Sequence, residues 1–198
     1  MKRWPVLLCA LLLAAAALGQ NAEPPNGLLL IAKPGLDDPR FRETVILVTQ
    51  TPDAQTVGVI LNRPTRAKLS EIIADEALAR NYADAVFFGG PVMDRTIVAL
   101  FRSEAAPPAP AFHVLKGLYL TMHPAAVESL LAEPGRRFRL YAGFSGWAPR
   151  QLESEMQRDS WYVLPATEEL VFRKDTSGMW RELVEKALGK RVRGDILD

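Results

Sequence analysis

Few residues of this sequence could do chemistry, and the most suggestive of them is a serine between two glycines. Ser145 lies in Gly143-Phe-Ser-Gly-Trp147, which is similar to the Gly-x-Ser-x-Gly turn that presents a serine nucleophile. Trp147 replaces the second glycine of that turn, and nothing in the sequence links a histidine to Ser145 as its base. We therefore expect Ser145 to shape a corner of the chain. A hydrolase that uses Ser145, Asp38 or a histidine is an alternative.

The two histidines do not predict a metal centre or a cofactor site. His113 and His123 are ten positions apart, without the i, i+4 spacing of a metal-binding pair on a helix. A metal would need several more ligands from distant segments. Asp37 and Asp38 could supply carboxylates, but adjacent Asp residues before Pro39 are typical of a turn. We predict no metal and no cofactor.

A rigid cation is predicted at Asn62-Arg63-Pro64. Pro64 favours an extended conformation for Arg63, and the amide of Asn62 can bind nearby backbone. The planar fork of Arg63 would then suit a carboxylate or a phosphate. The alternative is an internal role, in which Arg63 binds backbone carbonyls or an acid such as Asp38.

Glycine-rich turns could gather these residues into one site. Gly89-Gly90-Pro91 predicts a tight turn, and no Gly-Lys-Ser/Thr follows it, so it is not a phosphate loop. If this turn lies beside Gly143–Trp147, Arg63 could close a shallow pocket for an anion or a peptide. Trp147 would form the wall and Gln151 a polar tip. The alternative is that the tryptophans belong to the core and the glycines only serve bends.

Composition and charge narrow the class of function. The chain has 198 residues, of which 48% are hydrophobic and 24% charged, as expected of one globular domain. Its net charge is +1, and taking away Lys2 and Arg3 leaves −1. This balance lacks the basic footprint of a nucleic-acid binder, so we expect none as partner. A local basic patch is an alternative, at Arg136, Arg137 and Arg139 or at Lys190, Arg191 and Arg193, but short runs like these are typical of a solvated face.

The first residues are typical of a secretory signal. Lys2 and Arg3 precede an apolar run, and small residues follow before residue 20. We predict a signal peptide over 1–19, a flexible leader over 20–26 and one domain over 27–198. The apolar run is shorter than the ~20 residues of a comfortable bilayer span, so no stable membrane span is expected. The protein is then periplasmic or secreted. Cys9, inside this run, is the only cysteine.

Hydrophobic periodicity predicts an α+β domain. Apolar, alternating or β-branched runs indicate strands at 28–33, 45–49, 56–61, 86–88, 96–101, 117–121, 138–142 and 161–164. Helical patterns occupy 68–80, 124–132, 149–158, 167–172 and 177–189. Gly143 and Gly146 are expected to form a corner after the strand, with Pro149 in the first turn of the next helix. Hairpins mixed with helical connections favour a mixed or antiparallel sheet.

Four blocks of sequence together resemble the YqgE/AlgH family of bacterial proteins. They are Gly27-Leu-Leu-Leu-Ile-Ala-Lys-Pro-Gly-Leu-Asp-Asp-Pro-Arg-Phe41, Gly58-Val-Ile-Leu-Asn-Arg-Pro64, Phe88-Gly-Gly-Pro-Val92, and Ala142-Gly-Phe-Ser-Gly-Trp147 with Gln151-Leu-Glu153. The resemblance implies a single α+β domain with a bifurcated, barrel-like, largely antiparallel sheet flanked by helices. It also implies a label of transcriptional regulator, without an established reaction or cofactor.

The sequence departs from the family pattern in ways that bear on function. Lys33 stands where the family usually has Met, and Ala148-Pro149-Arg150 replaces a more glycine-rich link. A Leu-His pair that is common in the family is absent after Gly89-Gly90-Pro91, where this chain has Ala99-Leu100-Phe101. The signal-like start is also unusual, because family members are typically cytoplasmic. An exported member cannot act on the chromosome.

The sequence therefore favours a non-catalytic binding or accessory module. Its candidate binding residues are Asn62, Arg63, Gly89, Gly90, Ser145, Trp147 and Gln151. Its expected partner is another protein or a small anionic ligand. Besides the hydrolase, the other alternative is a cytoplasmic transcriptional regulator, which requires that the first residues are not a signal. The sequence does not determine the oligomeric state.

Overall fold

The structure, a computed structural model, describes residues 27–73 and 75–194, and of residues 190–194 only the backbone. The signal peptide and the leader expected over 1–26 lie outside the described residues. The strands are β1 (Leu28–Ala32), β2 (Val45–Gln50), β3 (Thr56–Ile60), β4 (Pro64–Lys68), β5 (Ala85–Phe88), β6 (Val92–Arg102), β7 (Phe112–Leu115), β8 (Leu118–Thr121), β9 (Phe138–Trp147) and β10 (Trp161–Pro165). The helices are α1 (Leu69–Ile72), α2 (Glu76–Ala79), α3 (Pro124–Ala132), α4 (Gln151–Gln157), α5 (Glu168–Val171) and α6 (Met179–Gly194).

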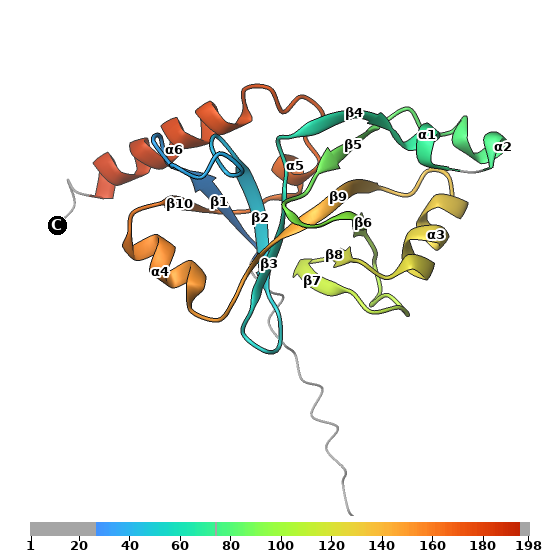
Figure 1. Ribbon diagram of the computed structural model, residues 1–198, viewed down its shortest axis with the longest axis horizontal. Coiled ribbons are helices and arrows are strands. Elements are labelled where there is room, and N and C mark those ends of the chain that lie inside the picture. Colours follow the sequence, from blue (N-terminus) through green and yellow to red (C-terminus); the bar gives the residue numbers. More distant parts are fainter. Residues whose placement is uncertain (1–26, 74, 195–198) are drawn as a thin grey trace, which may run out of the picture.

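These strands form one sheet that forks at β9. Its main path runs β10-β1-β2-β3-β9-β6-β8-β7, and neighbours on this path are antiparallel. β3 pairs with the end of β9 at Ser145–Trp147, whereas β5 runs parallel to its middle at Tyr141–Ala142 and carries β4 at its other edge. Figure 1 shows β9 crossing the middle of the molecule, between β1–β3 on one side and β6–β8 on the other. The predicted mixed, bifurcated, largely antiparallel α+β fold is confirmed.

The sheet curls like a barrel without closing into one. The path ends at β7, and no ladder joins β7 to another strand of the described chain except β8. One side-chain bond spans the gap, since the Thr49 hydroxyl of β2 donates to the His113 carbonyl of β7 at 3.2 Å. The curl therefore encloses a central core between β2 and β7.

Side chains alternate between the two faces of the sheet, and the buried ones form three separate hydrophobic cores. Leu29, Ile31 and Leu47 point into the central core, and Leu30 and Ile46 point to an outer core on the opposite face. The central core is covered by α6 through Met179, Leu183, Val184 and Ala187. The first outer core is covered by α4 and by the turn at residues 36–41, and the other by α1, α2 and α3. Burial on both faces explains why β1, β2 and β3 read as continuous apolar runs.

Several predicted boundaries were wrong. The single helix expected over 68–80 is two short helices, because the Asp75 carboxylate accepts the Leu78 N–H at 3.0 Å and starts a new helix there. β4 and β7 were not predicted, and Gly189 does not end the last helix, which continues to Gly194. The last helix was expected to start at Ser177, but the Ser177 hydroxyl donates to Asp175 at 2.7 Å and α6 begins at Met179.

Among the described residues, no helix is both long and apolar enough to cross a bilayer.

The expected glycine corner lies further along the chain than predicted. β9 continues through Gly143 and Gly146 to Trp147, because its last residues pair with β3. The backbone turns instead at Ala148–Arg150, where Arg150 has φ 64° in the left-handed region. Pro149 accordingly precedes α4 and does not enter its first turn.

Candidate functional site

The two glycine segments named from the sequence lie directly against each other. A Cβ on Gly89 would stand 2.2 Å from the Gly143 carbonyl oxygen, and one on Gly90 would stand 2.4 Å from both the Phe144 carbonyl oxygen and Ser145 Oγ. Gly143 has φ +68°. These contacts require glycine, because any side chain would collide with backbone. The junction joins the β5–β6 turn to β9.

Ser145 is a structural residue of this junction. Its hydroxyl donates to the Gly89 carbonyl at 3.1 Å, and the residue is fully buried. No hydrogen bond joins it to His113 or His123 in the described part of the chain. His113 stacks on Tyr119 with ring centroids 4.8 Å apart. The structure therefore does not bring together a nucleophile and a base here.

Asp38 also binds locally. Its carboxylate accepts the Arg40 backbone N–H at 2.9 Å and the Arg40 guanidinium at 2.7 Å. The guanidinium hydrogen bonds are the main cause that lowers the pKa of Asp38, and burial opposes them. Within the described residues, no group of three or more His, Cys, Asp or Glu is placed to hold a metal ion.

Trp147 and Gln151 belong to an internal network around Glu155. The Trp147 and Trp161 indole N–H groups both donate to Glu155 Oε2 at 3.0 Å, and Gln151 Nε2 donates to Glu155 Oε1 at 3.1 Å. Trp147 is 3% exposed and stacks on Phe41, with ring centroids 6.1 Å apart. One carboxylate thus fixes two indoles in the outer core beneath α4.

Asn62 and Arg63 hold the turn that precedes β2. The Asn62 amide accepts the Val45 N–H and donates to the Glu43 carbonyl, each at 2.9 Å. Arg63 donates to the carbonyls of Arg40 and Arg42, the latter at 2.9 Å. Burial lowers the pKa of Arg63, and the nearby charge of Glu43 opposes this shift.

The structure does not place Arg63 and Trp147 in one pocket. Arg63 contacts the backbone of the turn at residues 38–43, whereas Trp147 contacts the side chain of Phe41 from that turn. Asn62 and Arg63 line an open hollow of about 500 Å³, which we call the Arg63 hollow. It is lined by Arg42, Glu43, Asn62, Arg63, Pro64, Lys174, Asp175, Thr176, Ser177, Gly178, Trp180 and Arg181.

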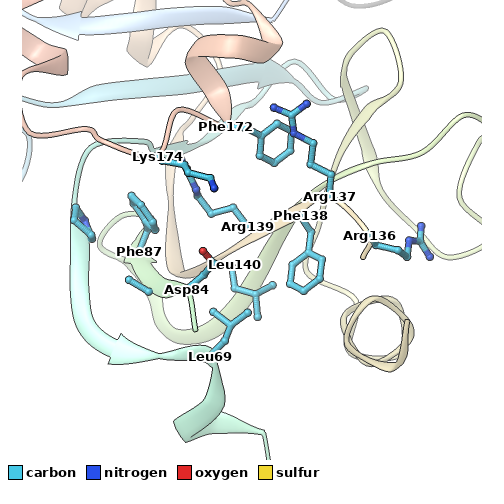
Figure 2. A pocket seen from close by; sticks show the side chains of 12 residues that line it. Leu69, Asp84, Phe87, Arg136, Arg137, Phe138, Arg139, Leu140, Phe172 and Lys174 are labelled. Carbon is cyan, nitrogen blue, oxygen red and sulfur yellow. The ribbon is translucent and has the colours of Figure 1, made fainter. Parts of the chain in front are cut away.

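A second, more basic hollow adjoins it, and we call it the Arg139 pocket. It measures about 440 Å³ and lies between β5, the first half of β9 and the segment that joins α5 to α6. Its lining is Pro64, Leu69, Asp84, Ala85, Phe87, Arg136, Arg137, Phe138, Arg139, Leu140, Phe172 and Lys174. Figure 2 shows that Lys174, Arg139, Phe87 and Asp84 lie around the same hollow, whereas Arg136 points away from it.

Arg139 is the most constrained cation of this pocket. Its guanidinium donates to the carbonyls of Val171 at 2.9 Å and Arg173 at 2.7 Å. It also lies 4.4 Å from the ring centroid of Phe87. Carbonyls and a ring fix the orientation of the guanidinium without neutralising its charge, and no described carboxylate pairs with it.

The neighbouring groups set the electrostatics of the Arg139 pocket. Arg137 pairs with Glu168 at 2.8 Å and covers Phe172, 4.7 Å from its ring centroid. Lys174 is exposed and forms no ion pair with a described residue. Asp84 is the one carboxylate in the lining. The pocket thus offers positive charge, apolar walls and one acidic edge.

A buried phenol lies next to Arg139 along the strand. Tyr141 is fully buried, and its hydroxyl has no hydrogen-bond partner among the described residues. Burial raises the pKa of Tyr141 to about 12. The Arg139 guanidinium opposes this shift, but it does not reach hydrogen-bond geometry with the hydroxyl. The phenol is neutral at physiological pH.

The sequence contained one sign of this pocket. Arg137 and Arg139 are two positions apart on a strand, so their side chains share a face. We expected that basic run to be a solvated face, but Arg139 is half-buried and bound to carbonyls from residues 171 and 173. Those partners come from a distant segment, and no local pattern indicates them.

Comparison with known proteins places the chain in a family. The family model described as AlgH-like (DUF179) matches residues 29–191. A UPF0301 protein of Thermobifida fusca is 33% identical over 174 residues, covering 83% of this chain and 88% of that protein. One from Streptomyces coelicolor is 34% identical over 175 residues, covering 86% and 88%.

Solved structures agree on the fold. The solution structure of the AlgH protein from Pseudomonas aeruginosa aligns with TM-score 0.66 at 24% identity, covering 82% of this chain and 87% of that one. A crystal structure of a Corynebacterium diphtheriae protein aligns with TM-score 0.65 at 23% identity, covering 83% and 87%. At this identity the two structures support the fold alone. The extent of the family match and the identity to the curated relatives show that this chain belongs to the AlgH-like (YqgE/AlgH) family.

Proposed function

We propose that this protein is a non-catalytic binding module that takes an anionic group of its ligand into the Arg139 pocket. The observation that carries the proposal is the environment of Arg139, whose guanidinium is held by two neutral carbonyls and an aromatic face. A cation that is already oriented loses little entropy when an anion binds. Lys174 adds a second charge at the rim, and Phe87 and Phe172 supply apolar walls.

The residues singled out from the sequence enter this proposal in two groups. Asn62 and Arg63 line the adjoining hollow and can contact the ligand directly. The others act as supports, because Ser145 and Trp147 are buried and the glycines fix the crossing of the β5–β6 turn and β9. Gln151 contributes through Glu155. A hydrolytic role gains no support from a serine without solvent access or a neighbouring base.

Isothermal titration calorimetry with citrate and inorganic phosphate at low ionic strength tests the proposal. We expect both anions to bind the wild type, and Lys174→Ala to weaken binding about 3- to 10-fold, which corresponds to roughly 0.6–1.4 kcal/mol. Lys116→Ala is the matched control, because Lys116 is an exposed lysine of the β7–β8 turn outside this pocket. Equal affinities of Lys174→Ala, Lys116→Ala and the wild type would overturn the proposal, as would an absence of binding.

We also propose that the module works outside the cytoplasm. The support is the sequence of residues 1–19, with its basic start and apolar run. Mass spectrometry of the N-terminus after cell fractionation tests this. An N-terminus near Gln20 in the periplasmic or secreted fraction is expected, and an intact Met1 in cytosol would favour a cytoplasmic role, the regulator included.

A further inference from the structure

The Arg139 pocket is one end of a longer groove. It shares Pro64 and Lys174 with the Arg63 hollow. That hollow in turn shares Arg42, Glu43 and Trp180 with a third hollow of about 280 Å³, which reaches Lys33–Asp37. Because they share these lining residues, the three hollows lie next to one another near the start of α6, and we call them together the groove.

Cations outnumber carboxylates along this groove. The cationic side chains are Lys33, Arg42, Arg63, Arg136, Arg137, Arg139, Lys174 and Arg181, and the carboxylates are Asp37, Glu43, Asp84 and Asp175. Five of the cations form no ion pair with any described residue, namely Arg42, Arg63, Arg139, Lys174 and Arg181. Asp175 is engaged by the backbone N–H and the hydroxyl of Ser177. The Arg139 pocket and the Arg63 hollow therefore each have a positive surplus, whereas the third hollow has two cations and two carboxylates. This surplus is local, because the overall net charge is close to zero.

We infer that the ligand is an extended acidic segment of a partner protein, which lies along the Arg139 pocket and the Arg63 hollow. The inference rests on the proposed function, because it places one carboxylate of that segment at Arg139. A compact small molecule would occupy one enclosed cavity and bury most of its surface there. Successive open hollows with a cation in each suit a chain that presents carboxylates at intervals. Lys174 lies between two hollows and serves both.

Fluorescence anisotropy with a labelled peptide of about 12 residues, which spans up to ~40 Å when extended, tests this inference. One peptide alternates Glu and Ser, and its control replaces every Glu by Gln. We expect the Glu peptide to bind at least tenfold more tightly than free glutamate, and the Gln peptide not to bind. Binding should weaken as salt rises, because the charges are solvent-accessible.

Two variants locate the peptide. Lys174→Ala, between the first two hollows, and Arg181→Ala, in the Arg63 hollow alone, should each weaken peptide binding about 3- to 10-fold, with Lys116→Ala as control. The affinity for citrate and phosphate should fall in Lys174→Ala and stay unchanged in Arg181→Ala.

The outcomes separate the inference from the proposed function. If Arg181→Ala binds the peptide like the wild type, or if the peptide binds no more tightly than glutamate, the inference of an extended acidic ligand is wrong. The proposed anion binding in the Arg139 pocket is then unaffected. If neither small anions nor the peptide bind, both fail. Tighter binding of a single-stranded oligonucleotide with the same number of charges would overturn the inference in favour of a nucleic-acid partner.

Discussion

Two arginines of this protein bind backbone carbonyls where arginines commonly bind carboxylates. Arg63 holds the carbonyls of Arg40 and Arg42, and Arg139 holds those of Val171 and Arg173. Each fixes a loop at the surface and keeps a full positive charge that no described carboxylate pairs with. At the residue scale, the same contact therefore fixes a loop and holds a guanidinium in one orientation, which is the basis of the proposed binding site.

The raised pKa of the buried Tyr141 phenol predicts that the protein loses stability in alkaline solution. Its pKa is about 12 in the folded protein and about 10 in an unfolded chain. The unfolded state loses its proton first, so stability is full below pH ~10 and declines as pH rises toward ~12. Denaturant unfolding at pH 8 and pH 11 should show this decline for the wild type, and Tyr141→Phe should reduce it. An equal decline in both proteins would contradict the assignment.

At the glycine junction, adding a single methyl group should strongly destabilise the fold. Gly89→Ala would place Cβ 2.2 Å from the Gly143 carbonyl oxygen, which is backbone and cannot move away cheaply. We expect a loss of more than about 3 kcal/mol in the free energy of unfolding. Gly189→Ala is the control, because a Cβ there meets nothing within 4 Å and alanine favours the helix by up to about 1 kcal/mol. Similar effects of the two substitutions in urea unfolding would contradict the prediction.

At the scale of elements, the sequence pattern predicts those helices and strands that depend mainly on residues close to one another in the chain. The β2–β3 hairpin follows from β-branched runs on both sides of a polar turn, and α3 from its apolar spacing after Pro124. β9 runs past Gly143 because β3 pairs with its last residues. That partner is distant in sequence, so the same glycine reads locally as the end of the strand.

The packing of α4 on the sheet depends on Glu155. Its carboxylate accepts the indole N–H groups of Trp147 and Trp161, both in the outer core. Glu155→Ala leaves both donors without an acceptor and should cost about 2–4 kcal/mol in the free energy of unfolding. Tryptophan fluorescence should report a more solvated environment in the same variant. Glu153→Ala, an exposed position of α4, should change neither measurement, and equal effects at both positions would refute this role of Glu155.

At the scale of the molecule, the candidate site also combines features that depend on neighbouring residues with features that depend on distant segments. The sequence predicts the extended conformation of Arg63, because it depends on the neighbouring Pro64. It gives the contact between the two glycine segments only as a hypothesis, because those segments are distant in the chain. It does not predict the Arg139 pocket, which the curled sheet and the segment between α5 and α6 assemble from residues 64–87, 136–140 and 172–174. A pocket between distant segments needs tertiary structure before its charges can be counted.

The three cores share strands, so the whole domain should unfold in one transition. Leu183 of α6 is fully buried in the central core, whereas Trp147 and Trp161 lie in an outer core on the opposite face of β1–β3. Leu183→Ala should cost about 2–5 kcal/mol, because it leaves a cavity. Leu188→Ala, at a position 44% exposed on the same helix, should change stability by no more than about 0.5 kcal/mol. Trp180 lies on α6 and packs against the central core, so both proteins should carry Trp180→Phe, which leaves Trp147 and Trp161 to report the outer core. Because β1–β3 form one wall of both cores, the midpoints from tryptophan fluorescence and far-UV circular dichroism should then shift together in Leu183→Ala. A shift in the dichroism alone would mean that α6 and the central core unfold separately from the tryptophan face.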